Sequence, residues 1–366
     1  MAPTDYSAAT TWAAQHVLAL VEIWALFAQH SGFVGAWRLM GVCRVSRAGV
    51  QEWLGTLPGL VLIGGRDGRW RPVSEVWRLD LATLQWKPMP ALVVARHDHA
   101  CCVVRKALVV LGGCFEDPEE GITSRVEILS GGSGNGVFTD LPALSCGETT
   151  TAVAIAVEES DSVAGQVLLL GGFIDLDDTW LFDTSSVHLV DLATGVCTPQ
   201  PGLLDGRSSF AAVCTPDGRI VCAGGHGSLA SVEVWGPPEV GPSSAPWIWT
   251  WLPEMNDGRY DCCGCVMSDG RFAVLGGRNN GPGGDTSTCE ALMIDDDEEW
   301  HWLHPMHHVR SGFACAAVAR CIIVAGGRNT TSTEVYDEAL ERWILLPCDL
   351  PTGNNNLFEM MGSALL

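Results

Sequence analysis

The sequence predicts an all-β fold, a six-bladed β-propeller, from three observations. A short apolar run that ends in Gly-Gly occurs six times in 366 residues, and its first glycine stands at positions 64, 112, 171, 224, 276 and 326. The intervals of 48 to 59 residues between these glycines are typical of radial repeats rather than of helical solenoids. The 42 glycines and 19 prolines supply the turns that many short strands require.

Each repeated run has the character of a strand that is buried on both faces. The first run, Leu60–Ile63, is apolar at every position instead of alternating with polar residues. The glycines that follow it, Gly64 and Gly65, permit positive φ angles and a close approach of other backbone. We therefore expect every run to be one strand of a four-stranded blade.

Composition and charge exclude several classes of partner. Lys and Arg total 21 against 43 Asp and Glu, and the net charge of -22 argues against nucleic acid and anionic membranes as partners. The 15 cysteines have no framework spacing and fall mostly inside apolar strands, which indicates a reducing compartment. The first residues lack the basic region of a secretory signal, and no apolar run is long enough to cross a bilayer. We expect a soluble cytoplasmic protein, with the nucleus as an alternative compartment, that needs no cofactor.

Residues 1–10 are expected to be a disordered leader, and residues 11–58 to form three short helices. In the first helix, apolar residues recur at spacings of three and four and so share one face: Val17, Leu20, Val21, Trp24 and Phe27. Ser31-Gly32 ends this pattern, and Leu57-Pro58 ends the last one. Helices this short bury little apolar surface on their own, so we expect them to pack on the next domain.

The segment 16–57 resembles an F-box. Leu20–Trp24 is similar to the opening helix of that family, Leu39–Arg44 contains its Val-Cys-Arg signature, and Trp53 is similar to its late tryptophan. The segment lacks the family's opening Leu-Pro, and Ser46 stands where a tryptophan usually follows the signature. The resemblance implies that five residues contact a Skp-type linker protein, which joins a cullin: Trp24, Met40, Val42, Cys43 and Trp53. The alternative is a helical plug that covers one face of the next domain.

From residue 59 onward the six repeats share one internal order. A strand follows each Gly-Gly loop, an aromatic outer strand precedes Leu-Pro or Pro-Met, and an arginine often precedes an inner strand of small residues. The outer aromatic residues are Trp86, Phe138, Trp251, Trp302 and Trp343, and the third repeat has Cys197 nearby instead. This order closely resembles the kelch repeat over residues 59–366, which implies six blades of four strands. The first blade lacks an inner strand, and we expect residues 360–366 to supply it and close the ring.

Seven arginines occupy loops that the kelch resemblance places on one face, around a central channel. Three of them directly follow a Gly-Gly: Arg66, Arg278 and Arg328. Four others precede inner strands: Arg96, Arg207, Arg259 and Arg310. Because guanidiniums bind carboxylates in a bidentate manner, we expect these seven residues to contact an acidic segment of a partner protein. The alternative is a local ion pair, since Asp205 and Asp257 stand two residues before an arginine.

Other candidate sites are predicted to be structural. Four histidines of one outer strand and loop alternate faces and would not converge on a metal ion: His301, His304, His307 and His308. Three neighbouring cysteines are expected to pack in the core: Cys262, Cys263 and Cys265. Neither a Gly-x-Ser-x-Gly elbow nor a His-Glu-x-x-His motif occurs, and the 3 tyrosines lack the context of a kelch copper-radical oxidase. We expect no catalytic residue and no metal.

The two resemblances together imply a protein-interaction adaptor and not an enzyme. The propeller binds a partner protein, the helical head recruits an SCF-type ubiquitin ligase, and the chain is monomeric outside that complex. A kelch scaffold with no ligase link, whose helices only cap the propeller, is one alternative. An enzyme or a small-ligand binder in the central channel is the other.

Overall fold

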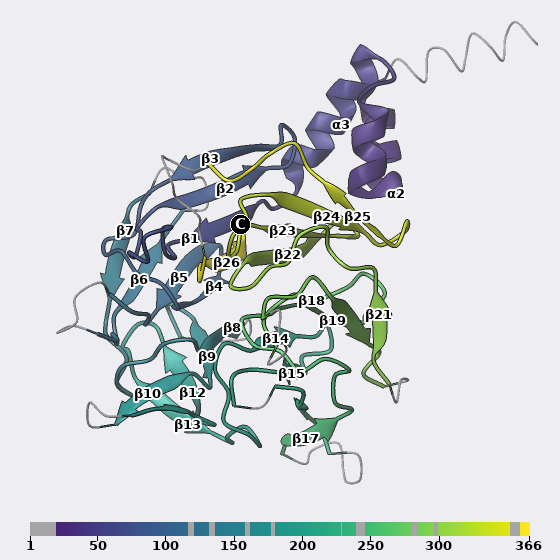
Figure 1. Cartoon of the computed structure of the whole chain (residues 1–366). Helices are drawn as coiled ribbons and strands as arrows, with labels where there is room; N and C mark the ends of the chain where they lie inside the picture. The colour runs from purple at the N-terminus through teal and green to yellow at the C-terminus, as the bar shows by residue number, and fades with distance from the viewer. Residues whose placement is uncertain are drawn as a thin grey trace, which may run out of the picture.

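The predicted six-bladed, all-β propeller is confirmed by the computed structural model (Figure 1). The structure describes residues 20–115, 121–131, 136–157, 162–176, 180–227, 229–238, 246–279, 284–295, 299–351 and 359–366. Within these ranges, six four-stranded antiparallel sheets form the ring, and one two-stranded hairpin and two helices are added to it. The expected leader at residues 1–10 lies outside the described residues.

The first three blades follow the chain in order, and in each blade the strands run from the inner to the outer position. Blade 1 contains β26 (Gly362–Leu365), β1 (Leu60–Ile63), β2 (Val76–Asp80) and β3 (Gln85–Met89). Blade 2 contains β4 (Ala100–Val104), β5 (Ala107–Leu111), β6 (Val126–Leu129) and β7 (Phe138–Leu141). Blade 3 contains β8 (Val153–Val157), β9 (Gln166–Leu170), β12 (Val187–Asp191) and β13 (Cys197–Gln200).

The other three blades repeat this arrangement. Blade 4 contains β14 (Ala211–Cys214), β15 (Ile220–Ala223), β16 (Val232–Gly236) and β17 (Ile248–Leu252). Blade 5 contains β18 (Cys263–Val266), β19 (Phe272–Leu275), β20 (Cys289–Leu292) and β21 (His301–Leu303). Blade 6 contains β22 (Ala314–Val318), β23 (Cys321–Ala325), β24 (Thr333–Asp337) and β25 (Arg342–Leu345). The added hairpin lies between the second and third strands of blade 3 and consists of β10 (Phe173–Leu176) and β11 (Trp180–Asp183).

The C-terminal strand completes the first blade. β26 pairs antiparallel with β1, with Ala364 opposite Val61, and the Gly59 N–H donates to the Leu366 carbonyl at 2.9 Å. The last strand of the chain therefore lies beside the first strand of the propeller (Figure 1). Pairing the two ends in one sheet leaves no open edge at the point where the ring closes.

A closed ring of backbone hydrogen bonds surrounds one mouth of the channel. The residue that enters each inner strand is in the left-handed region, with φ between 51° and 56°: Asp98, Thr151, Ser209, Asp261, Gly312 and Met360. Each N–H donates to the carbonyl oxygen of the equivalent residue in the preceding blade, at 2.7 to 3.1 Å. Non-glycine residues seldom adopt this conformation, so the ring of hydrogen bonds offsets the strain at five of the six positions.

The Gly-Gly pairs sit at the blade contacts that require them. In the first pair, Gly64 has φ 53° and Gly65 has φ 106°, as the sequence predicts for the end of a buried strand. A Cβ atom on Gly65 would lie 2.8 Å from the Glu359 carbonyl oxygen, and no side chain fits at that distance. The glycines therefore let the neighbouring segment pass against the end of the strand.

Two helices, and not the three expected, occur among the residues of this segment that the structure describes. α2 (Val21–Leu39) runs across a kink at Gly32, whose φ of 69° and ψ of 178° are not helical. The expected break at Ser31-Gly32 is therefore present, as a kink at which the backbone leaves the helical conformation. α3 (Arg44–Thr56) begins with a capping box, in which the Cys43 N–H donates to Ser46 Oγ at 2.9 Å and the Ser46 N–H donates to Cys43 Sγ at 3.3 Å.

The two helices form a head that packs on the propeller at blades 1 and 6. Their buried residues Phe33, Val50 and Leu54 share one hydrophobic core with Leu79 of β2 and Ile323 of β23. Figure 1 shows the head as an outgrowth on the side of the ring where these blades meet. None of the described helices combines the length and the apolar character that crossing a membrane requires.

Candidate functional site

Four of the seven arginines singled out in the sequence are completely buried. Each has 0% exposure and forms an ion pair with a glutamate, also at 0% exposure, on the third strand of a blade. The pairs are Arg96 with Glu127, Arg207 with Glu233, Arg259 with Glu290, and Arg310 with Glu334. The nitrogen–oxygen distance is 2.7 Å in each of the last three pairs.

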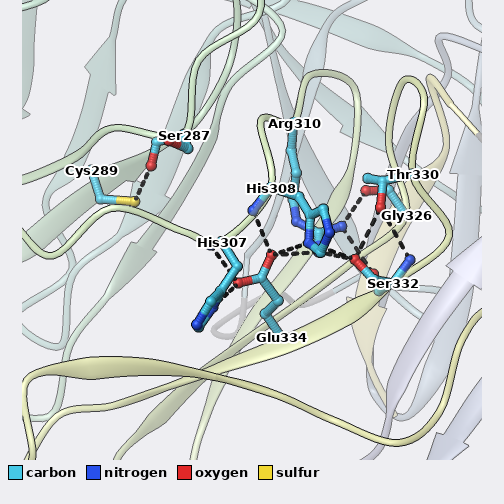
Figure 2. Close-up of polar contacts among 9 residues, drawn as sticks. All are labelled: Ser287, Cys289, His307, His308, Arg310, Gly326, Thr330, Ser332 and Glu334. Carbon is cyan, nitrogen blue, oxygen red and sulfur yellow. Dashed lines mark hydrogen bonds and ion pairs between the residues drawn. The ribbon is translucent and has the colours of Figure 1, made fainter.

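The pair in blade 6 shows which groups accept hydrogen bonds from such an arginine (Figure 2). Arg310 donates through Nη2 to Glu334 Oε1 at 2.7 Å, and through Nη1 to the Gly326 and Ser332 carbonyls at 2.6 and 2.9 Å. Glu334 also accepts the His307 N–H at 2.8 Å. Burial raises the pKa of Glu334, but the hydrogen bonds from Arg310 and His307 outweigh it and hold the pKa below its usual value.

These arginines join adjacent blades. The Arg310 carbonyl accepts the Gly277 N–H of blade 5 at 2.7 Å, while its guanidinium reaches into blade 6. Equivalent backbone bonds at 2.7 to 2.9 Å connect the other three arginines with the preceding blade. A fully desolvated guanidinium needs several acceptors and a counter-charge, and the seam between two blades supplies both.

The expectation that all seven arginines face a partner is therefore corrected for Arg96, Arg207, Arg259 and Arg310. No surface of these four side chains is open to a binding protein. The alternative of local aspartate partners is also not what the structure contains at Arg207 and Arg259, because their carboxylate partners are Glu233 and Glu290.

The other three arginines, Arg66, Arg278 and Arg328, remain partly exposed and lie in adjacent blades 1, 5 and 6. The exposed fraction of the side chain is 22% for Arg66 and 30% for Arg278. Each is backbone-bonded to the residue just before a member of the channel-mouth ring: Glu359, Tyr260 and Ser311. The equivalent positions in blades 2, 3 and 4 hold Cys114, Phe173 and His226. The structure thus brings these guanidiniums together on one side of the mouth.

Aromatic rings accompany the three guanidiniums. Arg66 and Arg328 both lie over the ring of Trp70, at 5.5 and 6.0 Å from its centroid, and Trp70 is 60% exposed. Arg278 lies over Tyr260 at 5.7 Å. Cation–π contacts hold a guanidinium in place without using its hydrogen-bond donors. We call these three arginines with the two aromatic rings the arginine arc.

Acidic groups are interspersed with the arginine arc. Arg66 bonds Asp98 at 3.0 Å, and Arg278 lies 3.4 Å from Asp285. Burial, with the nearby charge of Asp98, raises the pKa of Asp261 to about 6. Burial likewise raises the pKa of Glu359, against the opposing effect of Arg328 and Arg66. The net charge of this mouth therefore rises as the pH falls toward 6.

The channel itself is a cavity of about 310 Å³ that the inner strands line. Aspartate and hydroxyl groups lie at its entrance, and His99, Cys101 and Cys263 line the wall farther along the inner strands. Burial lowers the pKa of His99 to about 3, and no described residue hydrogen-bonds to either of its ring nitrogens. Within the described ranges, no three His, Cys, Asp or Glu side chains gather as metal ligands.

The residues expected to contact a Skp-type linker are divided between the interior and the surface. Trp24 is buried between the helices, where the Cβ of Gly49 would come within 2.7 Å of its Cβ. Met40 and Trp53 are half-buried against the core shared with the propeller. Val42 is 60% exposed and Cys43 is also exposed. Three further apolar side chains of the head face solvent: Leu20, Leu26 and Phe27.

The sequence analysis placed Trp251 and Trp302 on outer strands correctly, but it did not single out the tryptophans that pack against the preceding blade. Trp249 and Trp300 are buried, and their indole N–H groups donate to the Pro201 and Pro253 carbonyls of the preceding blade, both at 2.9 Å. Trp251 and Trp302, which the sequence suggested, are more than half exposed. The spacing to the following proline could have found Trp249, since Trp249 precedes Pro253 and Trp343 precedes Pro347 by four residues each.

The sequence interpretation also missed the four buried glutamates. Three of them stand between apolar neighbours in a third strand, as in Val232-Glu233-Val234, and Glu334 stands between Thr333 and Val335. A charge inside a buried strand requires a counter-charge, and that pattern was the available signal for an arginine partner.

Comparison with known proteins agrees with this architecture. A family model described as Kelch motif matches residues 60–92. Kelch-like protein terF of Aspergillus terreus is 26% identical over 281 residues, which cover 71% of this chain and 59% of that protein. F-box/kelch-repeat protein SKIP30 of Arabidopsis thaliana is 27% identical over 124 residues, which cover 31% of this chain and 33% of that protein. A second F-box/kelch-repeat protein of Arabidopsis thaliana is 37% identical over 67 residues, 16% of this chain and 18% of that protein.

This chain thus spans between 18% and 59% of the length of these curated relatives. The kelch match lies in blade 1 and does not extend to the two helices. The motif match and the relatives support a kelch-repeat propeller, and the sheet topology shows its six four-stranded blades.

Proposed function

We propose that this chain is a protein-interaction adaptor. Its propeller binds an acidic segment of a partner protein at the arginine arc, and its head recruits an SCF-type ubiquitin ligase. The observation that carries the first half is the exposure of Arg66, Arg278 and Trp70 on one side of the channel mouth. The chain itself makes and breaks no bond in this proposal and uses no cofactor.

The contacts within the arginine arc support a carboxylate-rich ligand. Asp98 occupies one side of the Arg66 guanidinium, and a guanidinium has five N–H donors, so further acceptors can bind it. Trp70 offers an exposed aromatic face between Arg66 and Arg328 for an apolar residue of the same segment. The raised pKa values of Asp261 and Glu359 reduce the negative charge that such a ligand would meet.

The head has one face that packs on the propeller and one that is exposed, and this division supports the proposed recruitment of a ubiquitin ligase. Phe33, Val50 and Leu54 attach the head to blades 1 and 6. Phe27 and Val42 remain 46% and 60% exposed, so a partner protein could contact both side chains. The F-box in the names of two relatives belongs to those proteins, and it adds weight to the F-box resemblance of residues 16–57.

The test of the propeller half removes the guanidiniums without disturbing the seams. A variant that combines Arg66→Ala, Arg278→Ala and Arg328→Ala should lose captured partners at least tenfold in quantitative affinity purification of the full chain. Its melting temperature should change by less than about 2 °C, because partly exposed pairs contribute little stability. Arg342→Ala on β25 is the matched control, as this arginine is exposed on an outer strand. Undiminished capture by the triple variant would overturn the proposal.

The test of the head uses its exposed apolar face. Full-length protein should recover a Skp-type linker and a cullin, and Phe27→Asp with Val42→Asp should abolish that recovery. Leu345→Asp is the control, because Leu345 is a similarly exposed apolar residue on β25. Failure of the unmodified chain to recover the linker would favour the kelch scaffold whose helices only cap the propeller. The core that the head shares with blades 1 and 6 supports that second candidate.

A further inference from the structure

Among the described residues, no arginine–glutamate ion pair of the kind found at four other seams connects blades 2 and 3. Thr149 occupies the arginine position, because its carbonyl accepts the Gly113 N–H at 2.9 Å in the bond that those arginines make. His188 occupies the glutamate position, opposite Leu169 in the register that the buried glutamates share. Neither residue can replace the missing ion pair, so this seam depends on other contacts.

The same seam also lacks the indole hydrogen bond. Cys197 lies opposite Val190 in the register in which Trp343 lies opposite Tyr336, so it occupies the tryptophan position of blade 3. Elsewhere the indole N–H reaches the loop that leaves the preceding blade. In this seam the equivalent loop, between β7 and β8, presents Cys146 to Cys197. A pair of thiols therefore stands where other seams have an indole and a carbonyl.

The two thiols are held together by the backbone around them. Cys146 Sγ and Cys197 Sγ are 2.8 Å apart, closer than the about 3.5 Å at which non-bonded heavy atoms usually pack. The Cys197 N–H donates to Ser145 Oγ at 2.8 Å, and the Ser145 N–H donates to the Gly195 carbonyl at 2.9 Å. A Cβ on Gly195 would lie 2.2 Å from the Ala143 carbonyl oxygen, so the loop and the strand are clamped side by side. No large rearrangement is needed to join the sulfur atoms.

The surroundings assign different roles to the two sulfurs. The hydrogen bond from the Cys146 thiol, reinforced by Ser145, lowers the pKa of Cys197 to about 6 against the effect of burial. The same contact raises the pKa of Cys146. Cys146 is exposed and Cys197 half-buried, so an oxidant in solution can reach the pair. Cys197 is the thiolate nucleophile, and Cys146 is the resolving thiol.

We propose that Cys146 and Cys197 form a modification site, a dithiol that hydroperoxides convert into a disulfide across the seam between blades 2 and 3. The Cys197 thiolate attacks one peroxide oxygen, the O–O bond breaks, and the leaving alkoxide or hydroxide takes up a proton. Cys146 sulfur then attacks the sulfenic acid sulfur of Cys197, the S–S bond forms, and the S–O bond breaks. The hydroxide that leaves combines with the Cys146 proton as water. Two thiols lose two electrons in total, and one hydroperoxide is reduced to an alcohol, or water, and a second water.

Oxidation is expected to connect blades 2 and 3 by a covalent bond, at the seam where the ion pair and the indole hydrogen bond are missing. The disulfide would join two cysteines that are 51 positions apart in the sequence and restrict the unfolded chain. We expect the melting temperature of the oxidised protein to exceed that of the reduced protein by about 5 °C. A dithiol this close should also bind one trivalent arsenical, and phenylarsine oxide is a suitable probe.

The experiment uses the reduced full-length chain and one equivalent of hydrogen peroxide at pH 7. Remaining thiols are blocked, the protein is digested without reductant, and peptides are mapped by mass spectrometry. The expected result is a Cys146–Cys197 cross-link as the main disulfide, reversed by dithiothreitol. Cys146→Ser should instead leave a sulfenic acid on Cys197 that dimedone traps, and it should lose binding of phenylarsine oxide.

The matched control is Cys214→Ser, which removes another exposed cysteine and should leave the cross-link unchanged. Absence of the cross-link in the unmodified chain would overturn the proposal, and so would oxidation of Cys214 at a rate equal to that of the pair. Both outcomes are measured on protein that retains Cys146 and Cys197, so they do not depend on the folding of the serine variants at these two positions.

Discussion

An arginine that enters an inner strand leaves water completely, and its five N–H donors then need partners within the protein. For the two terminal nitrogens of Arg310 these partners are Glu334, Gly326 and Ser332, whereas no described residue accepts a hydrogen bond from its Nε. Arg328 follows a Gly-Gly at the channel mouth, keeps contact with solvent and touches the exposed ring of Trp70. The two residues are 18 positions apart and share one chemistry, yet the first stabilises a seam and the second is available to a ligand.

This difference predicts opposite effects of the same substitution. Arg310→Ala should lower the free energy of unfolding by about 3–5 kcal/mol, because it leaves Glu334 charged and buried without its partner. Arg328→Ala should change it by less than about 0.5 kcal/mol. Equilibrium denaturation in urea measures both values. Equal losses would mean that Arg328 is structural as well and would remove it from the arginine arc.

Asp261 provides a prediction on pH. Its pKa is raised to about 6 in the folded protein, so ionising it costs folding free energy, and that cost develops as the pH rises through 4 to 6. Asp261→Asn removes the charge and should therefore stabilise the protein above pH 7, by up to about 3 kcal/mol. Below about pH 3, where the carboxyl is protonated in both folded and unfolded states, the variant and the unmodified protein should have nearly equal melting temperatures. A stabilisation that is independent of pH would contradict the assignment.

At the scale of elements, periodicity and glycine placement predicted the strands and the six blades, because the buried second strands are apolar at every position. Side-chain direction was not predictable in the same way. Trp249 and Trp251 stand in one strand, and only the contact with the neighbouring blade makes the first of them interior. The same holds for the arginines. Their positions in the loops before inner strands could be predicted from the sequence, but the burial of their side chains against a third strand could not. The break at Gly32 was predicted correctly from the sequence, whereas the buried contacts of the head on both sides of it were not.

A conservative substitution should distinguish the tryptophan that packs at a seam from the exposed tryptophan of the same strand. Trp249→Phe keeps an aromatic ring but removes the N–H that donates to Pro201, which should cost about 1 kcal/mol in the free energy of unfolding. Trp251→Phe, on the exposed side, should change that free energy by less than about 0.5 kcal/mol. Denaturation midpoints of the two variants measure the difference. A larger loss of unfolding free energy for Trp251→Phe than for Trp249→Phe would contradict this prediction.

At the scale of the whole molecule, the propeller is a closed ring of blades, and the contacts between neighbouring blades differ from seam to seam. In the part of the chain that the structure describes, four seams contain an arginine–glutamate pair, and three contain an indole hydrogen bond. The seam between blades 2 and 3 has a thiol pair instead. The six mouth residues add a hydrogen bond at every passage from blade to blade. Because the blades form a closed ring, weakening one seam should destabilise the whole propeller. The strand pairing that closes the ring is therefore as important to stability as any single contact.

Closure depends on β26, and its removal tests the circuit. Deletion of residues 360–366 takes away the partner of β1 and one member of the mouth ring, Met360. Val61 and its neighbours then lie on an unpaired, apolar edge, which exposes the chain to aggregation. We expect the melting temperature to fall by about 10 °C or more, and a synthetic peptide of residues 359–366 to restore part of that loss as its concentration rises. A truncated protein that melts at the same temperature as the full chain would show that the ring is stable without closure.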